Sequence, residues 1–125
     1  MRRSGCTVKD CGPFDTQSVD YPDFAGKVGR AVAQGEADRG VLICGSGIGM
    51  SIAANKIGGI RAAVVQDAEH ARLAAEHNGA NVLCIGGRFT APQLAQDIVT
   101  IWMNHDCTEA RHHRRINKIG ELETS

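Results

Sequence analysis

Short runs of apolar residues alternate along the chain with longer stretches in which apolar residues recur every three or four positions. The short runs predict β-strands over residues 6–10, 40–44, 60–65 and 81–85, the first of them weakly. The longer stretches predict helices over residues 22–34, 47–56, 67–77, 92–104 and 108–122, with a polar loop at 13–20. Strands and helices that alternate at this spacing favour a parallel sheet with right-handed crossovers, so we expect one α/β domain over residues 1–125.

Individual residues mark where the predicted helices begin and which face they bury. Pro22 suits a first helical turn, and Phe24, Val28 and Val32 follow at helical spacing. Asp67 can cap the helix that follows it. The continuous apolar run of the strand predicted at 81–85 is typical of a strand buried on both faces, as in a parallel sheet.

Composition and charge exclude several classes of protein. A chain of 125 residues can bury one ordinary core, and its 14 basic and 14 acidic residues leave no net charge, which argues against a nucleic-acid partner. The N-terminus has no apolar segment typical of a secretory signal, and no apolar run is as long as a membrane span. Five cysteines, an odd number without Cys-x-x-Cys pairs, favour reduced thiols, so we expect a cytoplasmic protein with no membrane partner.

The strand predicted at 40–44 ends in Cys44 and leads directly into the glycine-rich residues 45–49. Open α/β sheets bind ligands at the carboxyl ends of strands, and backbone N–H groups there can hold an oxygen that becomes anionic. Residues 45–49 lack the spacing of a dinucleotide-binding motif or a P-loop. Two interpretations stay open: a reactive thiol beside an oxyanion cradle, with the Ser46 hydroxyl as an extra donor, or a tight turn with a packed cysteine.

Cys84 and His77 carry weaker signals. Cys84 also lies near a strand end but lacks an extended glycine loop, so we expect it to be packed in the core. His77 and Asn78 lie between a predicted helix and a predicted strand. A histidine there is usually a capping or surface residue, although imidazole also suits proton transfer near pH 7.

Residues 111–115, Arg-His-His-Arg-Arg, form a local basic cluster on an otherwise neutral chain. Arg111 and Arg115 are four residues apart and project from one side of a helix, where two guanidinium groups suit a phosphate. Arg88, which follows two glycines at a strand end, is a possible third contact to an anion. The alternative for this cluster is a solvated helix face, and nucleic-acid contact explains so short a patch less well.

Several of these segments, taken in order, resemble one family. They are residues 20–25, 44–49 with 51–56, 59–62, 77–78 with 81–83, 87–88, and the pair Arg111 and Arg115. This ordered set resembles the ribose-5-phosphate isomerase B family of sugar-phosphate isomerases, which includes LacA and LacB, over nearly the whole chain, from about residue 5 to about residue 119. The resemblance implies a Rossmann-like three-layer α/β/α sandwich with a mostly parallel sheet.

The resemblance also implies an activity and an assembly. The expected reaction interconverts ribose 5-phosphate and ribulose 5-phosphate, a step of the pentose phosphate pathway, through an enediolate and without a metal or redox cofactor. The expected assembly is a homodimer, or a dimer of dimers, with shared active sites. In each site the cysteine loop of one chain faces the histidine and arginines of the other.

Roles for single residues follow from the resemblance. Cys44 matches the base, Ser46 matches a Thr or Ser in the loop that holds the enediolate, and His77 matches the residue that opens the sugar ring. The positions matched to substrate binding are Gly45, Gly47, Gly49, Asn78, Arg88, Arg111 and Arg115, the last two as a phosphate clamp.

The chain departs from the family at its beginning. The family starts with a strand that ends in an Asp-His pair and a helix that follows, whereas residues 5–12 here match the family's second strand. We therefore expect the edge of a neighbouring strand to be uncovered. We also expect that either the true start of the protein lies upstream of residue 1 or this chain is a fragment. The alternatives to the expected reaction are isomerisation of galactose 6-phosphate, allose 6-phosphate or a tetrose phosphate, or sugar-phosphate binding without catalysis.

Overall fold

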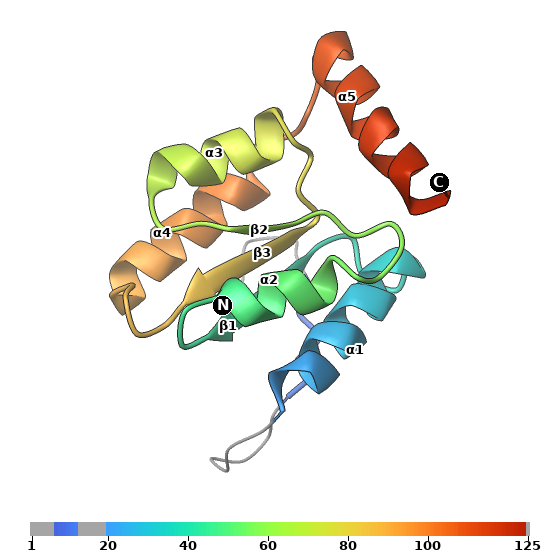
Figure 1. The fold of residues 1–125 in the computed structure, drawn as a ribbon. Coiled ribbons are helices and arrows are strands. Elements are labelled where there is room, and N and C mark those ends of the chain that lie inside the picture. Colours follow the sequence, from blue (N-terminus) through green and yellow to red (C-terminus); the bar gives the residue numbers. More distant parts are fainter. Residues whose placement is uncertain (1–6, 13–19, 125) are drawn as a thin grey trace.

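The computed structural model describes residues 7–12 and 20–124, which form a three-layer α/β/α sandwich. Helices α1 and α2 cover one face of a parallel sheet, and α3 and α4 cover the other (Figure 1). The architecture confirms the predicted fold class. Within the described ranges, no helix is long and apolar enough to cross a bilayer. The elements in chain order are α1 (Tyr21–Ala33), β1 (Gly40–Cys44), α2 (Ile48–Ala54), β2 (Ala62–Val64), α3 (Ala68–Glu76), β3 (Val82–Gly86), α4 (Pro92–Met103), α5 (Ala110–Glu121) and the 3₁₀ turn η1 (Leu122–Thr124).

The predicted elements agree with the structure except at the start of the chain. The strand predicted at 40–44 is β1, and α1, α3 and α4 begin and end within one residue of their predicted bounds. The strand predicted at 6–10 is wrong over residues 7–10, which are exposed and form no strand. A strand needs a neighbour to satisfy its backbone N–H and C=O groups, and residues 7–10 pair with no strand in the described part of the chain. Residue 6 and residues 13–19 of the predicted loop lie outside the described residues.

The sheet has the strand order β1-β3-β2, with all described pairs parallel. β3 is central and buried along its whole length, as its continuous apolar run predicts. Along β1, Leu42 pairs with Cys84 and Cys44 pairs with Gly86. The other edge of β1 has no partner strand among the described residues, and Ile43 on this strand is 51% exposed. The carboxyl ends of β1 and β3 therefore lie together at one end of the sheet.

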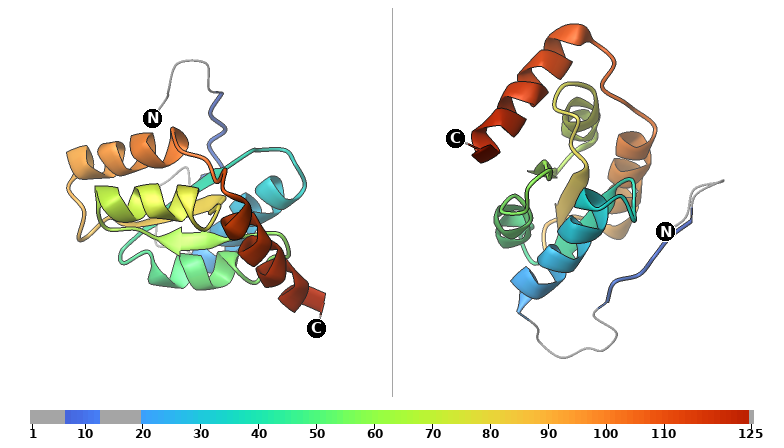
Figure 2. Two further views of the ribbon diagram at one scale, coloured as in Figure 1. Left: turned by 90° about the horizontal axis from the view of Figure 1, so that it is seen from above. Right: turned by 90° about the vertical axis from the view of Figure 1, so that its right-hand side faces the viewer.

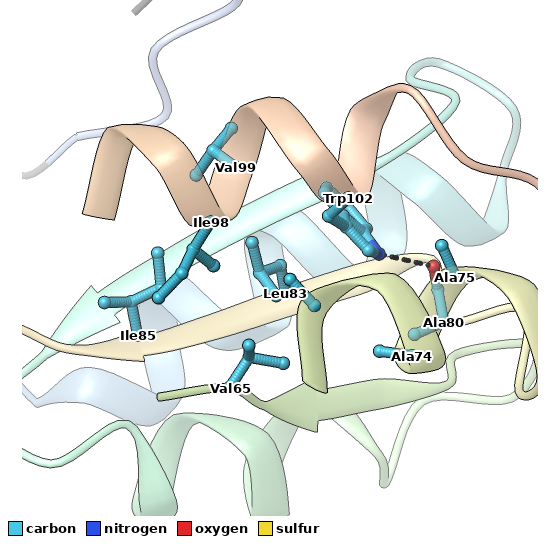
Figure 3. Packing of buried hydrophobic residues seen from close by; sticks show 10 residues of the cluster. Val65, Ala74, Ala75, Ala80, Leu83, Ile85, Ile98, Val99 and Trp102 are labelled. Atoms are coloured by element: carbon cyan, nitrogen blue, oxygen red, sulfur yellow. Dashed lines mark hydrogen bonds between the residues drawn. The ribbon is translucent and has the colours of Figure 1, made fainter. Parts of the chain in front are cut away.

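Two apolar cores flank the sheet and fix the ends of its strands. One core lies between the sheet and the α3–α4 layer, around Trp102, Leu83 and Ile98 (Figure 3). The indole Nε1 of Trp102 donates a hydrogen bond of 3.1 Å to the carbonyl oxygen of Ala80, just before β3 begins. The other core lies between the sheet and the α1–α2 layer. Because both faces are packed, the loops at the two ends of the strands start from fixed positions.

Arg39 anchors the segment that leads from α4 to α5. Its Nη1 donates to the carbonyl oxygen of Trp102 at 2.6 Å, and its guanidinium lies 5.2 Å from the centre of the Trp102 ring. Its Nη2 forms an ion pair with Asp106 beyond the end of α4. Beyond this anchor, α5 extends along the side of the sandwich near the end of α3 (Figures 1 and 2).

Candidate active site

Cys44 ends β1, and its thiol is turned toward the loop that follows. The Gly47 N–H donates to the Cys44 Sγ at 3.2 Å. Gly47 has φ +81°, a left-handed conformation that a side chain would strain, and it immediately precedes α2. Cys44 is partly buried and packs against the core between the sheet and the α1–α2 layer. The predicted arrangement of a thiol beside a glycine loop is therefore present, with a backbone donor directed at the sulfur.

The end of β3 holds the Cys44 loop in position through backbone hydrogen bonds. The Gly87 N–H donates to the Cys44 carbonyl oxygen at 2.6 Å, and the Arg88 N–H donates to the Gly45 carbonyl oxygen at 3.1 Å. Gly86 lies so close that a Cβ added to it would be 2.6 Å from the Ser46 carbonyl oxygen. The loop is therefore packed directly against the backbone of Gly86, where there is no room for a side chain.

Ser46 and Arg88 complete this group of residues. The Ser46 Oγ accepts a hydrogen bond from the Ile48 N–H at 3.2 Å, which leaves the hydroxyl proton free to be donated. The Arg88 guanidinium lies over Gly45, whose added Cβ would be 3.2 Å from its Nε. A Cβ added to Gly49 would be 2.5 Å from the Tyr21 ring, so the start of α1 covers this side of the loop. Cys44, residues 45–49 and Arg88 are therefore brought together.

Cys84 is packed in the core as expected. It is fully buried on the same face of the sheet as Leu42 and Cys44. Burial, with a smaller contribution from the nearby Cys44, raises the pKa of the Cys84 thiol to about 12. Cys84 therefore stays protonated near neutral pH, in contrast to the requirement for a thiolate base or nucleophile.

His77 and Asn78 lie at the opposite end of the sheet from Cys44. Helix α3 follows β2 and runs back, so that His77 at its C-terminal end lies near the amino end of β3 (Figure 1). Strands rise about 3.3 Å per residue, and the length of β3 alone separates the two ends by roughly 15 Å. Both residues are exposed and line an open cleft of about 1140 Å³ that is bordered by β2, α3 and the end of α5. One chain therefore does not bring His77 to its own Cys44.

Arg111 and Arg115 lie near His77, on the first turns of α5. Both side chains are exposed, and the Arg111 Nε donates to the Glu109 carboxylate at 2.9 Å. That contact lowers the pKa of Glu109, with further contributions from His112 and His77. The structure thus divides the predicted site residues into two groups, one around Cys44 and one around His77 and α5.

His112 is the buried histidine of α5, and the sequence analysis gave it no role of its own within the basic cluster 111–115. It is 5% exposed, and its ring stacks on the His77 ring with centroids 4.3 Å apart and an interplanar angle of 21°. Its Nε2 lies 3.2 Å from the Glu109 carboxylate but outside hydrogen-bond geometry. The sequence could have predicted this burial, because His112, Ile116 and Ile119 lie at positions i, i+4 and i+7 and so share one apolar face of the helix.

Comparisons with known proteins agree over nearly the whole chain. A sequence model of the Ribose/Galactose Isomerase family matches residues 1–119. The chain is 50% identical over 119 residues to the putative sugar phosphate isomerase YwlF of Bacillus subtilis, covering 95% of this chain and 76% of that protein. It is 44% identical to the ribose-5-phosphate isomerase B of Escherichia coli, covering 95% of this chain and 80% of the relative. The solved structure of Clostridium thermocellum ribose-5-phosphate isomerase B superposes with a TM-score of 0.94 at 50% identity, covering 97% of this chain and 82% of that one.

Proposed function

The chain belongs to the ribose/galactose isomerase family of sugar-phosphate isomerases, and from this premise we propose that it interconverts ribose 5-phosphate and ribulose 5-phosphate. The observation that carries the proposal is the Cys44 loop, in which a thiol, a backbone N–H directed at it and a serine hydroxyl surround one point at the end of β1. An aldose–ketose isomerisation moves one proton between neighbouring carbons and needs a base beside an oxyanion site.

In the proposed mechanism, the Cys44 thiolate removes the proton from C2 of the open-chain aldose phosphate. The electrons of that bond form the C1–C2 double bond, and the former carbonyl oxygen on C1 becomes the enediolate oxygen. Backbone N–H groups of residues 45–49 and the Ser46 hydroxyl stabilise the negative charge on that oxygen. A proton moves from the C2 hydroxyl to the C1 oxygen, and Cys44 returns its proton to C1, which yields the ketose phosphate.

The second half of the proposed site comes from another copy of the chain. His77, Asn78, Arg111 and Arg115 lie at the opposite end of the sheet from Cys44, so a site that uses both groups needs two chains. In that homodimer, or dimer of dimers, Arg111 and Arg115 bind the phosphate, Asn78 and Arg88 bind the sugar, and His77 opens the ring. Binding of the phosphate, far from the reacting carbons, holds C1 and C2 of the substrate in position beside the Cys44 base.

The test of the base is Cys44→Ala, with Cys107→Ala as the matched control because Cys107 is also partly buried and lies outside the Cys44 loop. Loss of a general base costs about 10²- to 10⁴-fold in kcat, and we expect that loss for Cys44→Ala with little change in KM. The measurement is the rate of ribose 5-phosphate conversion by the two variants, after thermal unfolding has shown that they are equally stable. Equal kcat in the two variants would remove Cys44 from the mechanism.

The test of the shared site is a mixture of two inactive variants, Cys44→Ala and His77→Ala. Random exchange makes half of the dimers hybrids, and each hybrid holds one intact site, so activity should return to about a quarter of the wild-type value. Mixed variants that stay inactive while mass spectrometry detects hybrids would show that each chain builds its own site.

Other sugar phosphates are the nearest alternative substrates, since the family description names galactose as well as ribose. Ratios of kcat/KM for ribose 5-phosphate, galactose 6-phosphate, allose 6-phosphate and a tetrose phosphate decide among them. Cytoplasmic localisation stays a prediction from the cysteine count.

A second candidate function is sugar-phosphate binding without catalysis. It is favoured by the edge of β1 that has no partner strand among the described residues. Two measurements separate catalysis from binding alone. Calorimetry measures binding of ribose 5-phosphate, and an activity assay measures its turnover, each for this chain and for a chain extended upstream. Binding without turnover in both chains would favour the second candidate.

A further inference from the structure

A stacked pair of histidines, one at the end of α3 and one on α5, has members that differ in environment. His77 is exposed at the end of α3, whereas His112 is 5% exposed in the first turns of α5. Their ring centroids lie 4.3 Å apart, and the ring planes are nearly parallel. One face of the His77 ring is therefore covered, which limits the orientations its nitrogens can take.

The charged groups around the pair keep its two members distinct. Burial lowers the pKa of His112, and the nearby His77 and Arg111 lower it further, with a smaller contribution from Arg115. Glu109 acts in the opposite direction. His112 is therefore harder to protonate than an ordinary histidine, and the exposed His77 is the member of the pair that a bound molecule can reach.

Packing alone does not account for a histidine at position 112. The other residues on the same face of α5 are Ile116 and Ile119, and Ile116 packs against Gly79, next to Asn78. An apolar residue at position 112 would fill the space without placing a polar nitrogen in it. As it is, the buried Nε2 of His112 makes no hydrogen bond among the described residues, and the exposed Glu109 carboxylate 3.2 Å away lies outside hydrogen-bond geometry. Such a nitrogen destabilises a fold, so its presence needs another reason.

We infer that His112 is a positioning residue for His77: its stacked ring orients the His77 imidazole toward the sugar ring of the substrate. The inference rests on the proposed function, in which His77 opens that ring. Opening breaks the bond between C1 and the ring oxygen. The C1 hydroxyl loses a proton, C1 gains its carbonyl, and the ring oxygen gains a proton. An imidazole fixed within reach of these oxygens accelerates the step, whereas proton transfer at carbon depends on Cys44.

The test compares two reactions of the same enzyme. Conversion of ribose 5-phosphate requires ring opening. Exchange of the C1 proton of ribulose 5-phosphate in D₂O, followed by NMR, requires only the base, because the 5-phosphate prevents that ketose from closing to a furanose. In His112→Ala, we expect kcat/KM for ribose 5-phosphate to fall about tenfold or more while the exchange rate stays within about twofold. His112→Phe, which keeps a stacked ring, should recover most of the loss.

His113→Gln is the matched control, since His113 is exposed on the same helix and contacts the carbonyl oxygen of Cys107 rather than His77. It should leave both reactions unchanged. An equal fall of conversion and exchange in His112→Ala, or a Phe variant as impaired as the Ala variant, would overturn the inference. The pH profile of conversion should change in His112→Ala and stay unchanged in His113→Gln.

A measurement without turnover separates this inference from the proposed function. The ¹⁵N resonances of the His77 ring report its tautomer and mobility in the free protein. They should shift or broaden in His112→Ala and keep nearly their wild-type positions in His113→Gln. Unchanged His77 resonances in His112→Ala would overturn the inference whatever the activity. A wild-type protein inactive in both reactions would instead overturn the proposed function.

Discussion

The Cys44 loop and helix α5 carry the two halves of the proposed site and are held in place by different means. The loop is bound by backbone hydrogen bonds to the end of β3, and Gly86 packs against it without room for a side chain. Helix α5 is held by side chains: the His112 stack on His77, Ile116 against Gly79, and, in η1, Glu123, which accepts a hydrogen bond from the Gly59 N–H at 2.8 Å.

This difference shows how one fold can keep one half of a site rigid and the other adjustable. The position of the proposed oxyanion cradle beside Cys44 follows from the sheet itself, and almost any folded state with β1 beside β3 preserves it. The position of the arginine pair depends on a few contacts of one helix, so a partner chain or a bound phosphate can shift it at modest cost. If the two groups have their proposed roles, a preorganised cradle and an adaptable phosphate-binding helix suit a substrate that is held by its phosphate.

The largest expected difference between the Cys44 half, held by β3, and helix α5 is in the protection of their backbone amides from hydrogen exchange. Amides of β3 are buried and paired on both sides, whereas α5 buries one residue, so β3 should be protected at least about a hundredfold more than α5. The measurement is native-state exchange of the free protein, read residue by residue. Equal protection of α5 and β3 would show that the helix belongs to the same cooperative unit as the sheet.

Gly86→Ala should destabilise the protein by about 3 kcal/mol, because its Cβ would collide with the Ser46 carbonyl and backbone must move. Gly120→Ala is the matched control on α5, where a Cβ meets nothing within 4 Å, and it should be neutral or stabilise by up to about 1 kcal/mol. Urea unfolding measures both changes. A Gly86→Ala protein as stable as the Gly120→Ala protein would mean that the loop is not held as described.

Replacing both Arg111 and Arg115 by alanine should raise KM for the sugar phosphate by about 100-fold or more, since each charged hydrogen bond to phosphate contributes about 1.5–3 kcal/mol and two are lost. Thermal stability should change little because both side chains are exposed. Arg114→Ala, also exposed on α5, is the control and should keep the wild-type KM. Steady-state kinetics at fixed ionic strength gives the comparison, and equal KM values for the two proteins would place the phosphate elsewhere.

The sequence predicted the Cys44 half of the site better than the other half, for a physical reason. β1, Cys44 and residues 45–49 are consecutive, so strand propensity and glycine spacing place them together without knowledge of the tertiary fold. The contact of His112 with His77 joins helices that are distant in sequence, and it depends on the course of the chain between Asn104 and Glu109. The strand predicted at 6–10 failed because local pattern does not say whether a neighbouring strand is there to pair with it.

Trp102 gives the protein an intrinsic fluorescent probe at a useful position. It is the one tryptophan of the chain, and its fully buried indole bonds to Ala80, three residues after His77. Its emission should be blue-shifted in the folded protein and should move to longer wavelength when water enters the α3–α4 layer. A substitution in α5 that alters kinetics but leaves this emission unchanged has therefore left the α3–α4 layer intact, and the distinction can be made in a cuvette without any label.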